Sequence, residues 1–142
     1  MDAIVMLRAD HKKVEALFKK VAKDDLSVVP EICSALTEHA FIEEQVFYPA
    51  VRAEVDGELD EVLEAVEEHH VVKLLVEELG DLDPSDETYK AKATVLMELV
   101  RHHVVEEESE MFPRVRDALG RRRLTELGAA LEKARRSAPA PA

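Results

Sequence analysis

Four segments of this chain carry apolar residues at helical spacing, and a histidine stands near the middle of each apolar stripe. The segments cover roughly residues 2–23, 30–54, 58–79 and 84–119. Residues at i, i+3, i+4 and i+7 share one face of a helix, so each stripe is expected to face a core. The stripes are Ile4–Leu7–His11–Val14–Phe18, Ile32–Leu36–His39–Glu43–Val46, Val62–Val66–His69–Val72–Val76 and Leu96–Val100–His103–Glu107–Met111.

Short connections between the four helices predict antiparallel neighbours, so the expected fold class is all-α, an up-down-up-down four-helix bundle. We expect the bundle to occupy residues 1–120. Residues 121–142 are predicted to form a short amphipathic, basic helix with Leu124, Leu127 and Leu131 on one face, followed by a frayed Ala/Pro tail.

Prolines mark the expected helix boundaries. Pro30 and Pro84 suit the first turns of the second and fourth helices, with Asp83 as an N-cap, whereas Pro113 should kink or end the fourth helix. A helix that began at Ser85 would place His103 about 27 Å from its start. The fourth helix therefore either overhangs the bundle or starts nearer residue 90.

The charge balance limits the classes of partner. The 142 residues include 19 basic and 31 acidic side chains, a net charge of −12. Such a charge argues against nucleic acid and anionic membranes as partners. Residues 114–142 are the exception, with 8 basic and 3 acidic side chains, and we expect them to fold back on the acidic bundle. The single cysteine fits a cytoplasmic location, and no apolar stretch approaches the length of a membrane span.

The two halves of the chain resemble each other. The string DHKKVEAL aligns with EHHVVKLL at a shift of 58 residues, and EHAFIEEQVFYP aligns with HHVVEEESEMFP at a shift of 64. The alignment pairs His11 with His69 and His39 with His103, so it favours these residues over the adjacent histidines at 70 and 102. Each adjacent histidine is rotated by about 100° on its helix and is not expected to reach the same site.

The stripes bring together imidazoles and carboxylates without a lysine or arginine. A buried carboxylate without a positive partner costs several kcal/mol or stays protonated. Two divalent or trivalent metal ions would supply the charge, and imidazole with carboxylate suits iron, manganese or zinc. A plain structural bundle with core histidines is the alternative, but two His-x3-Glu pairs on matching stripes favour the metal site.

These motifs together resemble the hemerythrin-like (HHE cation-binding) family over most of residues 5–118. The matching motifs are DHxxV…L at His11, HxxxEE…FYP at His39, EHxxV…L at His69 and HxxxEE…MFP at His103. The resemblance implies a hemerythrin-like bundle with two non-haem iron ions joined by an oxo or hydroxo bridge. It implies four terminal histidine ligands and two bridging glutamates: His11, His39, His69, His103, Glu43 and Glu107.

Three further residues are candidates for a layer around these ligands. Glu44 and Glu108 stand beside the implied bridges and are expected to orient a histidine or to face solvent. Tyr48 is the third candidate, but Phe47 continues the line through His39 and Glu43. We therefore predict that both aromatic residues pack in the core.

The chain departs from the oxygen carriers of this family at one point. They have a further histidine one turn from the third-helix ligand, where this chain has Ala65 and Lys73. An open position on each ion then favours binding or consuming O2 or hydrogen peroxide, with catalase- or peroxidase-like handling of oxidative stress and an unidentified reductant. The alternatives are an oxygen- or iron-sensing or iron-handling module, and reversible O2 binding.

Overall fold

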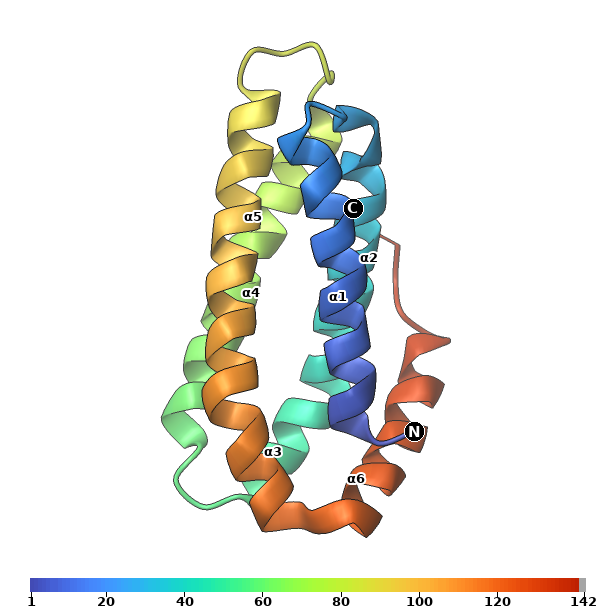
Figure 1. Cartoon of the computed structure of the whole chain (residues 1–142), viewed down its shortest axis with the longest axis vertical. Helices are drawn as coiled ribbons and strands as arrows, with labels where there is room; N and C mark the ends of the chain where they lie inside the picture. Colours follow the sequence, from blue (N-terminus) through green and yellow to red (C-terminus); the bar gives the residue numbers. More distant parts are fainter. Residues whose placement is uncertain (141–142) are drawn as a thin grey trace.

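The computed structural model describes residues 1–140, and in this range the secondary structure is entirely helical (Figure 1). The α-helices are α1 (Ala3–Ala22), α2 (Val29–Ile42), α3 (Tyr48–Glu54), α4 (Leu59–Asp81), α5 (Tyr89–Glu106) and α6 (Phe112–Arg135). A 3-10 turn, Leu26–Val28, precedes α2. The π-helical segments Glu43–Phe47 and Glu107–Met111 join α2 to α3 and α5 to α6. The predicted all-α, up-down-up-down bundle is confirmed.

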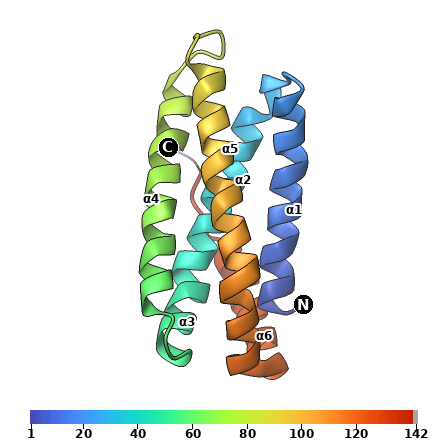
Figure 2. The same ribbon diagram turned by 60° about the vertical axis from the view of Figure 1, so that its left-hand side comes forward.

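Four long helical segments, called rods below, make up the bundle: α1, α2 continued by α3, α4, and α5 continued by α6 as far as Gly120. The four rods form two antiparallel pairs. In Figure 1, α1 and α5 lie toward the viewer, with α2 and α4 behind them; Figure 2 shows the same arrangement from another side. The histidines of the four stripes lie in one layer, since their inward nitrogens contact the same two glutamates, Glu43 and Glu107. The four rods thus deliver one imidazole each to a common layer.

The layer of histidines divides the apolar core in two. One part lies toward α3 and the start of α6 and includes Leu7, Ile42 and Phe112, all at most 2% exposed. The other lies toward the α4–α5 loop and includes Phe18 and Leu96. The stripes therefore pack as predicted above and below the histidines, and they hold the layer from both sides.

The chain reverses at Gly120, whose φ of 75° lies in the left-handed region that favours glycine. The rest of α6 then packs beside α1, and the predicted apolar face is buried at Leu124, Leu127 and Leu131. Gly128 permits this close approach, because a Cβ there would lie 2.1 Å from the carbonyl oxygen of Met1.

The basic residues of this segment pair with acidic residues of the bundle. Arg123 binds both carboxylate oxygens of Glu54, at 2.8 and 2.7 Å, and Arg135 contacts Glu38 and Asp10. The C-terminal segment thus folds back on the bundle, as its charge predicts.

The helix start expected at Asp83 and Pro84 is wrong, and the alternative start near residue 90 is confirmed, because α5 begins at residue 89. Asp83 accepts hydrogen bonds from Ser85, and Asp86 does the same for Thr88. These side chains bond to nearby backbone in non-helical turns and so compete with the helix. Pro113 does not end its rod either, since it occupies the first turn of α6 after the π-helical segment.

None of the helices in the described range combines the length and apolar character that a membrane span requires.

Candidate metal centre

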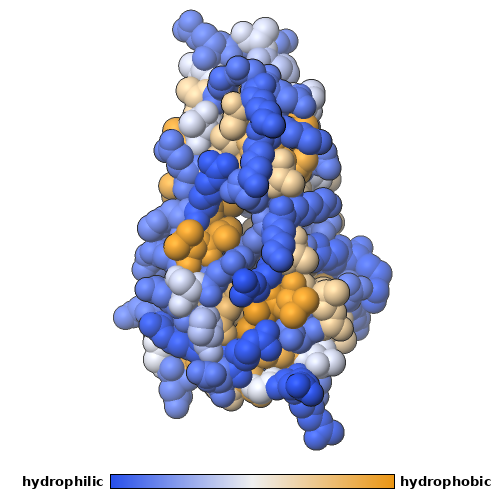
Figure 3. Space-filling model, viewed as in Figure 1, coloured by the Kyte–Doolittle hydropathy of each residue, from blue (hydrophilic) through white to orange (hydrophobic). Residues whose placement is uncertain are grey.

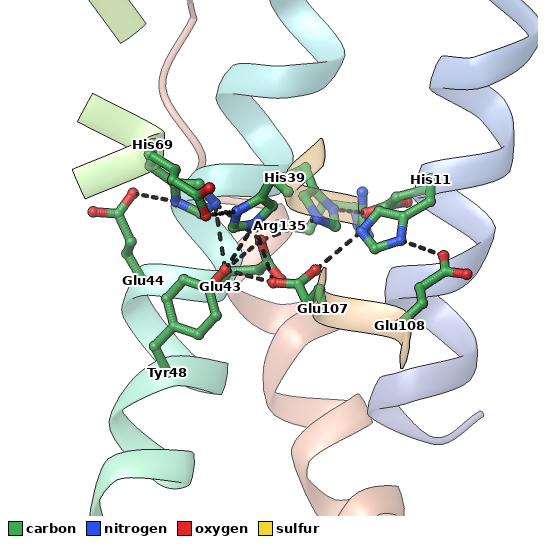
Figure 4. Close-up of polar contacts among 12 residues, drawn as sticks. His11, His39, Glu43, Glu44, Tyr48, His69, Glu107, Glu108 and Arg135 are labelled. Atoms are coloured by element: carbon green, nitrogen blue, oxygen red, sulfur yellow. Dashed lines mark hydrogen bonds and ion pairs between the residues drawn. The ribbon is translucent and has the colours of Figure 1, made fainter. Parts of the chain in front are cut away.

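The six residues implied as ligands converge in the layer at mid-bundle (Figure 4). One histidine comes from each of α1, α2, α4 and α5, and the two glutamates are the first residues of the π-helical segments. All six are buried, whereas the side chains of His70 and His102 are 63% and 65% exposed. The repeat therefore distinguishes the inward histidine of each pair.

Each glutamate lies between histidines of two different rods. Glu43 Oε1 is 3.1 Å from His39 Nε2 and 3.2 Å from His69 Nε2. Glu107 reaches His11 Nε2 at 3.1 Å with Oε1 and His103 Nε2 at 3.2 Å with Oε2.

The same residues form two trios whose donor atoms lie within 4.8 Å of one another: His11, His39 and Glu107, and Glu43, His69 and His103. Each glutamate also touches a histidine of the other trio, so each carboxylate contacts both trios.

A second carboxylate binds the outer nitrogen of every histidine, and the four pairs form a closed ring around the bundle. Each rod supplies a carboxylate to the histidine of the next rod, in the order α1, α2, α4, α5 and back to α1. The Nδ1 contacts are His39–Asp10 at 2.8 Å, His69–Glu44 at 3.0 Å, His103–Glu68 at 2.7 Å and His11–Glu108 at 2.6 Å. Such a partner holds the proton on Nδ1 and directs Nε2 inward as a potential ligand.

Glu44 and Glu108 were expected either to orient a histidine or to face solvent. The structure shows the first, since each contacts a histidine. Sequence reasoning missed Asp10 and Glu68 in this ring. A signal was present, because an acidic residue directly precedes the histidine in both DHxxV and EHxxV motifs, and the repeat aligns them.

Tyr48 points into the layer, so the prediction that it only packs is wrong. Its hydroxyl donates to Glu107 Oε2 at 2.5 Å and lies 3.2 Å from both Glu43 Oε1 and His103 Nε2. Phe47, by contrast, is fully buried and packs edge-on against Phe112, as predicted.

The π-helical segment explains this difference. Tyr48 N–H bonds to the carbonyl of Glu43, five residues back, so this hydrogen bond spans one residue more than in an α-helix. The extra residue rotates Tyr48 into the line that Phe47 would have continued. The proline at 49 has no N–H and would clash with the carbonyl four residues back in a regular α-helix, which favours the wider turn before it.

The second half of the chain repeats the wide turn but not the hydroxyl. Phe112 occupies the position that aligns with Tyr48, and its ring stacks on His11 at a centroid distance of 5.9 Å. The trio with His69 and His103 therefore has a phenol beside it, and the trio with His11 has an apolar ring.

Protons stabilise the layer where a metal ion is not bound. Burial alone lowers the pKa of His39, but the negative charge of Glu43 and a hydrogen bond to Asp10 raise it to about 10. Burial likewise opposes protonation of His103, but hydrogen bonds to Glu107 and Glu68 raise its pKa well above the usual value. The buried carboxylates of Glu43 and Glu107 are thus stabilised by nearby positive charge, which either protonated histidines or metal ions can supply.

The residues present fit metal ions. Within residues 1–140, the buried Nε2 atoms of His11 and His39 and one oxygen each of Glu43 and Glu107 have no aligned hydrogen-bond partner. His11 Nε2 and Glu107 Oε1 are nevertheless only 3.1 Å apart, so they are close without pointing at each other. This geometry suits atoms that converge on a shared ion.

Comparison with known proteins agrees with this site. The sequence matches the family model of the hemerythrin HHE cation-binding domain over residues 2–115. It is 35% identical over 119 residues to a protein of Nostoc sp. described as a DNA nickase, covering 80% of this chain but only 33% of that protein. The chain thus spans about a third of that relative's length.

Among solved structures, the chain resembles a hemerythrin HHE cation-binding domain-containing protein from Mycobacterium kansasii, with a TM-score of 0.77. The match covers 96% of this chain and 89% of the other, at 22% identity, and therefore bears on the fold alone.

Proposed function

The chain belongs to the hemerythrin HHE cation-binding family, and we propose that it holds two non-haem iron ions and uses them to bind or consume O2 or hydrogen peroxide. In this proposal the four buried histidines are terminal ligands, Glu43 and Glu107 bridge the ions, and an oxo or hydroxo group completes the bridge. The family match supports cation binding; the iron count, the bridge and the oxidant are our proposal.

The observation that carries the proposal is the pair of buried carboxylates between four inward-facing imidazoles. With the ring of Asp10, Glu44, Glu68 and Glu108, six carboxylates surround four histidines. Two arginines reach the ring: Arg135 contacts Asp10, and Arg8 lies 3.8 Å from Glu108. Two metal ions would balance this charge, and oxygen and nitrogen donors without a thiolate suit iron.

An iron pair, when bound, supplies the two electrons by which O2 or hydrogen peroxide is reduced. The chain's own residues then control protons and water around it. Burial and the charges of Glu107 and Glu43 raise the pKa of Tyr48 well above its usual value, so its hydroxyl keeps its proton. That hydrogen is directed at Glu107 Oε2, which places a proton donor on one side of the layer.

Peroxide turnover is favoured over oxygen carriage by the residues around His69. Ala65 is buried in the apolar core and Lys73 is exposed, so neither adds a donor where oxygen carriers have a further histidine. Fewer protein donors leave positions for an exchangeable small molecule.

The test is to load the full chain with iron, reduce it anaerobically, and mix it with O2 or hydrogen peroxide. We expect rapid oxidation by both and release of O2 from excess peroxide, followed with an oxygen electrode. Glu107→Gln should abolish the release, while Glu110→Gln, an exposed glutamate one turn along, should retain it. An oxygenated form that returns O2 under vacuum, without peroxide turnover, would instead establish reversible carriage.

Two facts oppose DNA nicking as the function of this chain. That relative is about three times as long as the matched region, and a net charge of −12 opposes binding to nucleic acid. Sensing or iron handling has no observation in its favour beyond the site itself.

A further inference from the structure

The internal repeat relates two sites on the outside of the histidine layer, one between α1 and α2 and the other between α4 and α5. The shift of 58 residues carries Asp10 to Glu68, and the shift of 64 carries Glu38 to His102. Asp10 and Glu68 each bind the outer nitrogen of an inward histidine. The two sites therefore adjoin the layer in the same way.

The site between α1 and α2 holds a positive group. The guanidinium of Arg135 contacts both Glu38 and Asp10, and it lies 2.9 Å from Asp10. It reaches this position because α6 turns back at Gly120 and packs its apolar face on α1 and α2. At this place in the repeat, the structure thus pairs the carboxylates with a cation that the chain itself supplies.

The site between α4 and α5 is not closed in this way. Within residues 1–140, the later part of α6 lies on the other side of the bundle (Figures 1 and 2). Figure 3 shows mainly hydrophilic side chains along the left edge, where the lower halves of α4 and α5 lie. Four positions that pack in the apolar core shared with α6 are replaced by glutamates here: Ala3, Met6, Ile42 and Val46 correspond to Glu61, Glu64, Glu106 and Glu110. This face thus suits a cation and not a second apolar helix.

These glutamates line a groove of about 100 Å³ between α4 and α5. The lining runs from exposed glutamates to two buried residues of the layer, His103 and Glu107, and within residues 1–140 it includes no lysine or arginine. One oxygen of Glu61 is buried without an aligned hydrogen-bond partner, and Arg114 approaches only the other oxygen, at 3.9 Å. The groove therefore links the surface to the layer and is negatively charged along its length.

Three side chains beside this groove, called the outer trio below, have donor atoms within 4.8 Å of one another: Glu68, His102 and Glu106. His102 Nε2 lies 3.1 Å from Glu106 Oε1 and 4.0 Å from Glu68 Oε2. The other oxygen of Glu68 lies 2.7 Å from His103 Nδ1. One carboxylate thus faces the outer trio with one oxygen and the layer with the other.

We propose that the outer trio binds a divalent cation and that the groove is the route by which iron reaches the centre. The outer site needs only its three side chains, whereas the route rests on the proposed iron pair. Imidazole with carboxylate suits divalent iron, manganese or zinc, and three protein donors leave the other positions to water. A cleft lined by charge of one sign raises the association rate of the opposite ion by about 10–1000-fold.

The outer site is tested by calorimetric titration with Co(II) at low ionic strength, on the iron-loaded and the metal-free chain. We expect one Co(II) per chain beyond the central ions, and H102Q/E106Q should weaken this step at least about tenfold. The matched control is E67Q/H70Q, which removes the same residue types from an exposed pair on α4. It should leave every step in place. An unchanged outer step in H102Q/E106Q would overturn the site.

A second variant imitates the site between α1 and α2. Glu106→Arg places a guanidinium beside Glu68, as Arg135 does beside Asp10. It should abolish the outer Co(II) step, while Glu67→Arg, an equal change of charge at an exposed position on α4, should retain it. A folded Glu106→Arg protein that still binds the outer Co(II) would contradict the proposal.

The route is tested by the rate of iron uptake. Metal-free chain is mixed with Fe(II) without O2, unbound iron is removed with a chelator at intervals, and bound iron is measured. We expect H102Q/E106Q to take up iron at least about tenfold more slowly and to reach the same final content, because the central ligands remain. Equal rates would overturn the route. A chain that takes up no central iron but keeps the outer Co(II) step would refute the iron pair and the route, while the outer site would stand.

Discussion

Replacing Asp10 by asparagine should lower the affinity for one of the two proposed metal ions and leave the affinity for the other unchanged. Asp10 Oδ2 lies 2.8 Å from His39 Nδ1 and 2.9 Å from Arg135. Burial opposes the charge of Asp10, but its contacts with His39 and Arg135 keep the pKa of this carboxyl below its usual value. Asparagine has the same shape and still accepts a hydrogen bond, so the change isolates the charge.

The size of the effect follows from that contact. A hydrogen bond to a charged group contributes about 1.5–3 kcal/mol and a neutral one about 0.5–1.5 kcal/mol, a difference of about 1–1.5 kcal/mol. That corresponds to about tenfold in affinity, at the lower end of the 10–100-fold range for groups that orient metal ligands. Only the trio of His11, His39 and Glu107 contains the affected imidazole.

Anaerobic titration of metal-free protein with Fe(II) or Co(II) measures this. We expect two binding steps in the native chain and one step shifted by about tenfold in Asp10→Asn. Glu54→Gln, which breaks an ion pair with Arg123 far from the layer, should leave both steps in place. Equal weakening of both ions, or no change, would refute the assignment of one ring carboxylate to one trio.

Further predictions concern the ligands, the metal, pH and packing. His69→Ala should lose metal, measured by elemental analysis, while His70→Ala should retain it, because only the first faces the layer; equal losses would contradict the repeat alignment. Metal removal should lower the free energy of unfolding by about 4 kcal/mol for free metal at a thousand times Kd, as measured by denaturant titration of both forms; indistinguishable curves would favour a plain structural bundle. In the metal-free protein, the raised pKa of His39, about 10 when folded against 6.5 in its reference state, stabilises the fold fully below pH 6.5. That contribution is lost as pH rises from 6.5 through 10, so calorimetry should show a falling melting temperature over this range, and a rising one would contradict the sign. Gly128→Ala should destabilise the chain by about 1–3 kcal/mol, since the new methyl group meets the carbonyl of Met1, and an unchanged melting temperature would show that the contact relaxes freely.

Periodicity alone was enough to predict the rods and the layer. A residue on an apolar stripe is placed by its helix, so His11, His39, His69 and His103 converge once the helices pack with their stripes facing inward. The repeat resolved which histidine of each pair points inward. Both inferences need only regular α-helical geometry, which holds from the start of each rod to the layer.

The same reasoning failed where the geometry is not α-helical. Tyr48 lies beyond a wide turn that rotates everything after it, and counting in steps of 3.6 residues places it on the wrong face. Asp83 and Pro84 indicated a helix start that does not form, because Asp83 and Asp86 bond to local backbone, and only the distance of His103 from Ser85 pointed to the observed start near residue 90. Asp10 and Glu68 were missed because each contacts a histidine of a neighbouring helix, His39 and His103. An apolar stripe describes the faces of one helix and does not predict contacts between helices.

The wide turns also bear on the repeat of the chain and on its tolerance to change. Both halves carry the extra residue at corresponding places, 43–47 and 107–111, and a proline follows two residues after each segment, so the wide turn belongs to the repeated pattern. An in-frame deletion of one codon, such as that of Gln45, would place Tyr48 four residues after Glu43, which is the same line in a regular α-helix. The phenol would therefore stay in the layer. Pro49 would then follow a turn of ordinary width, where its ring clashes with the carbonyl four residues back.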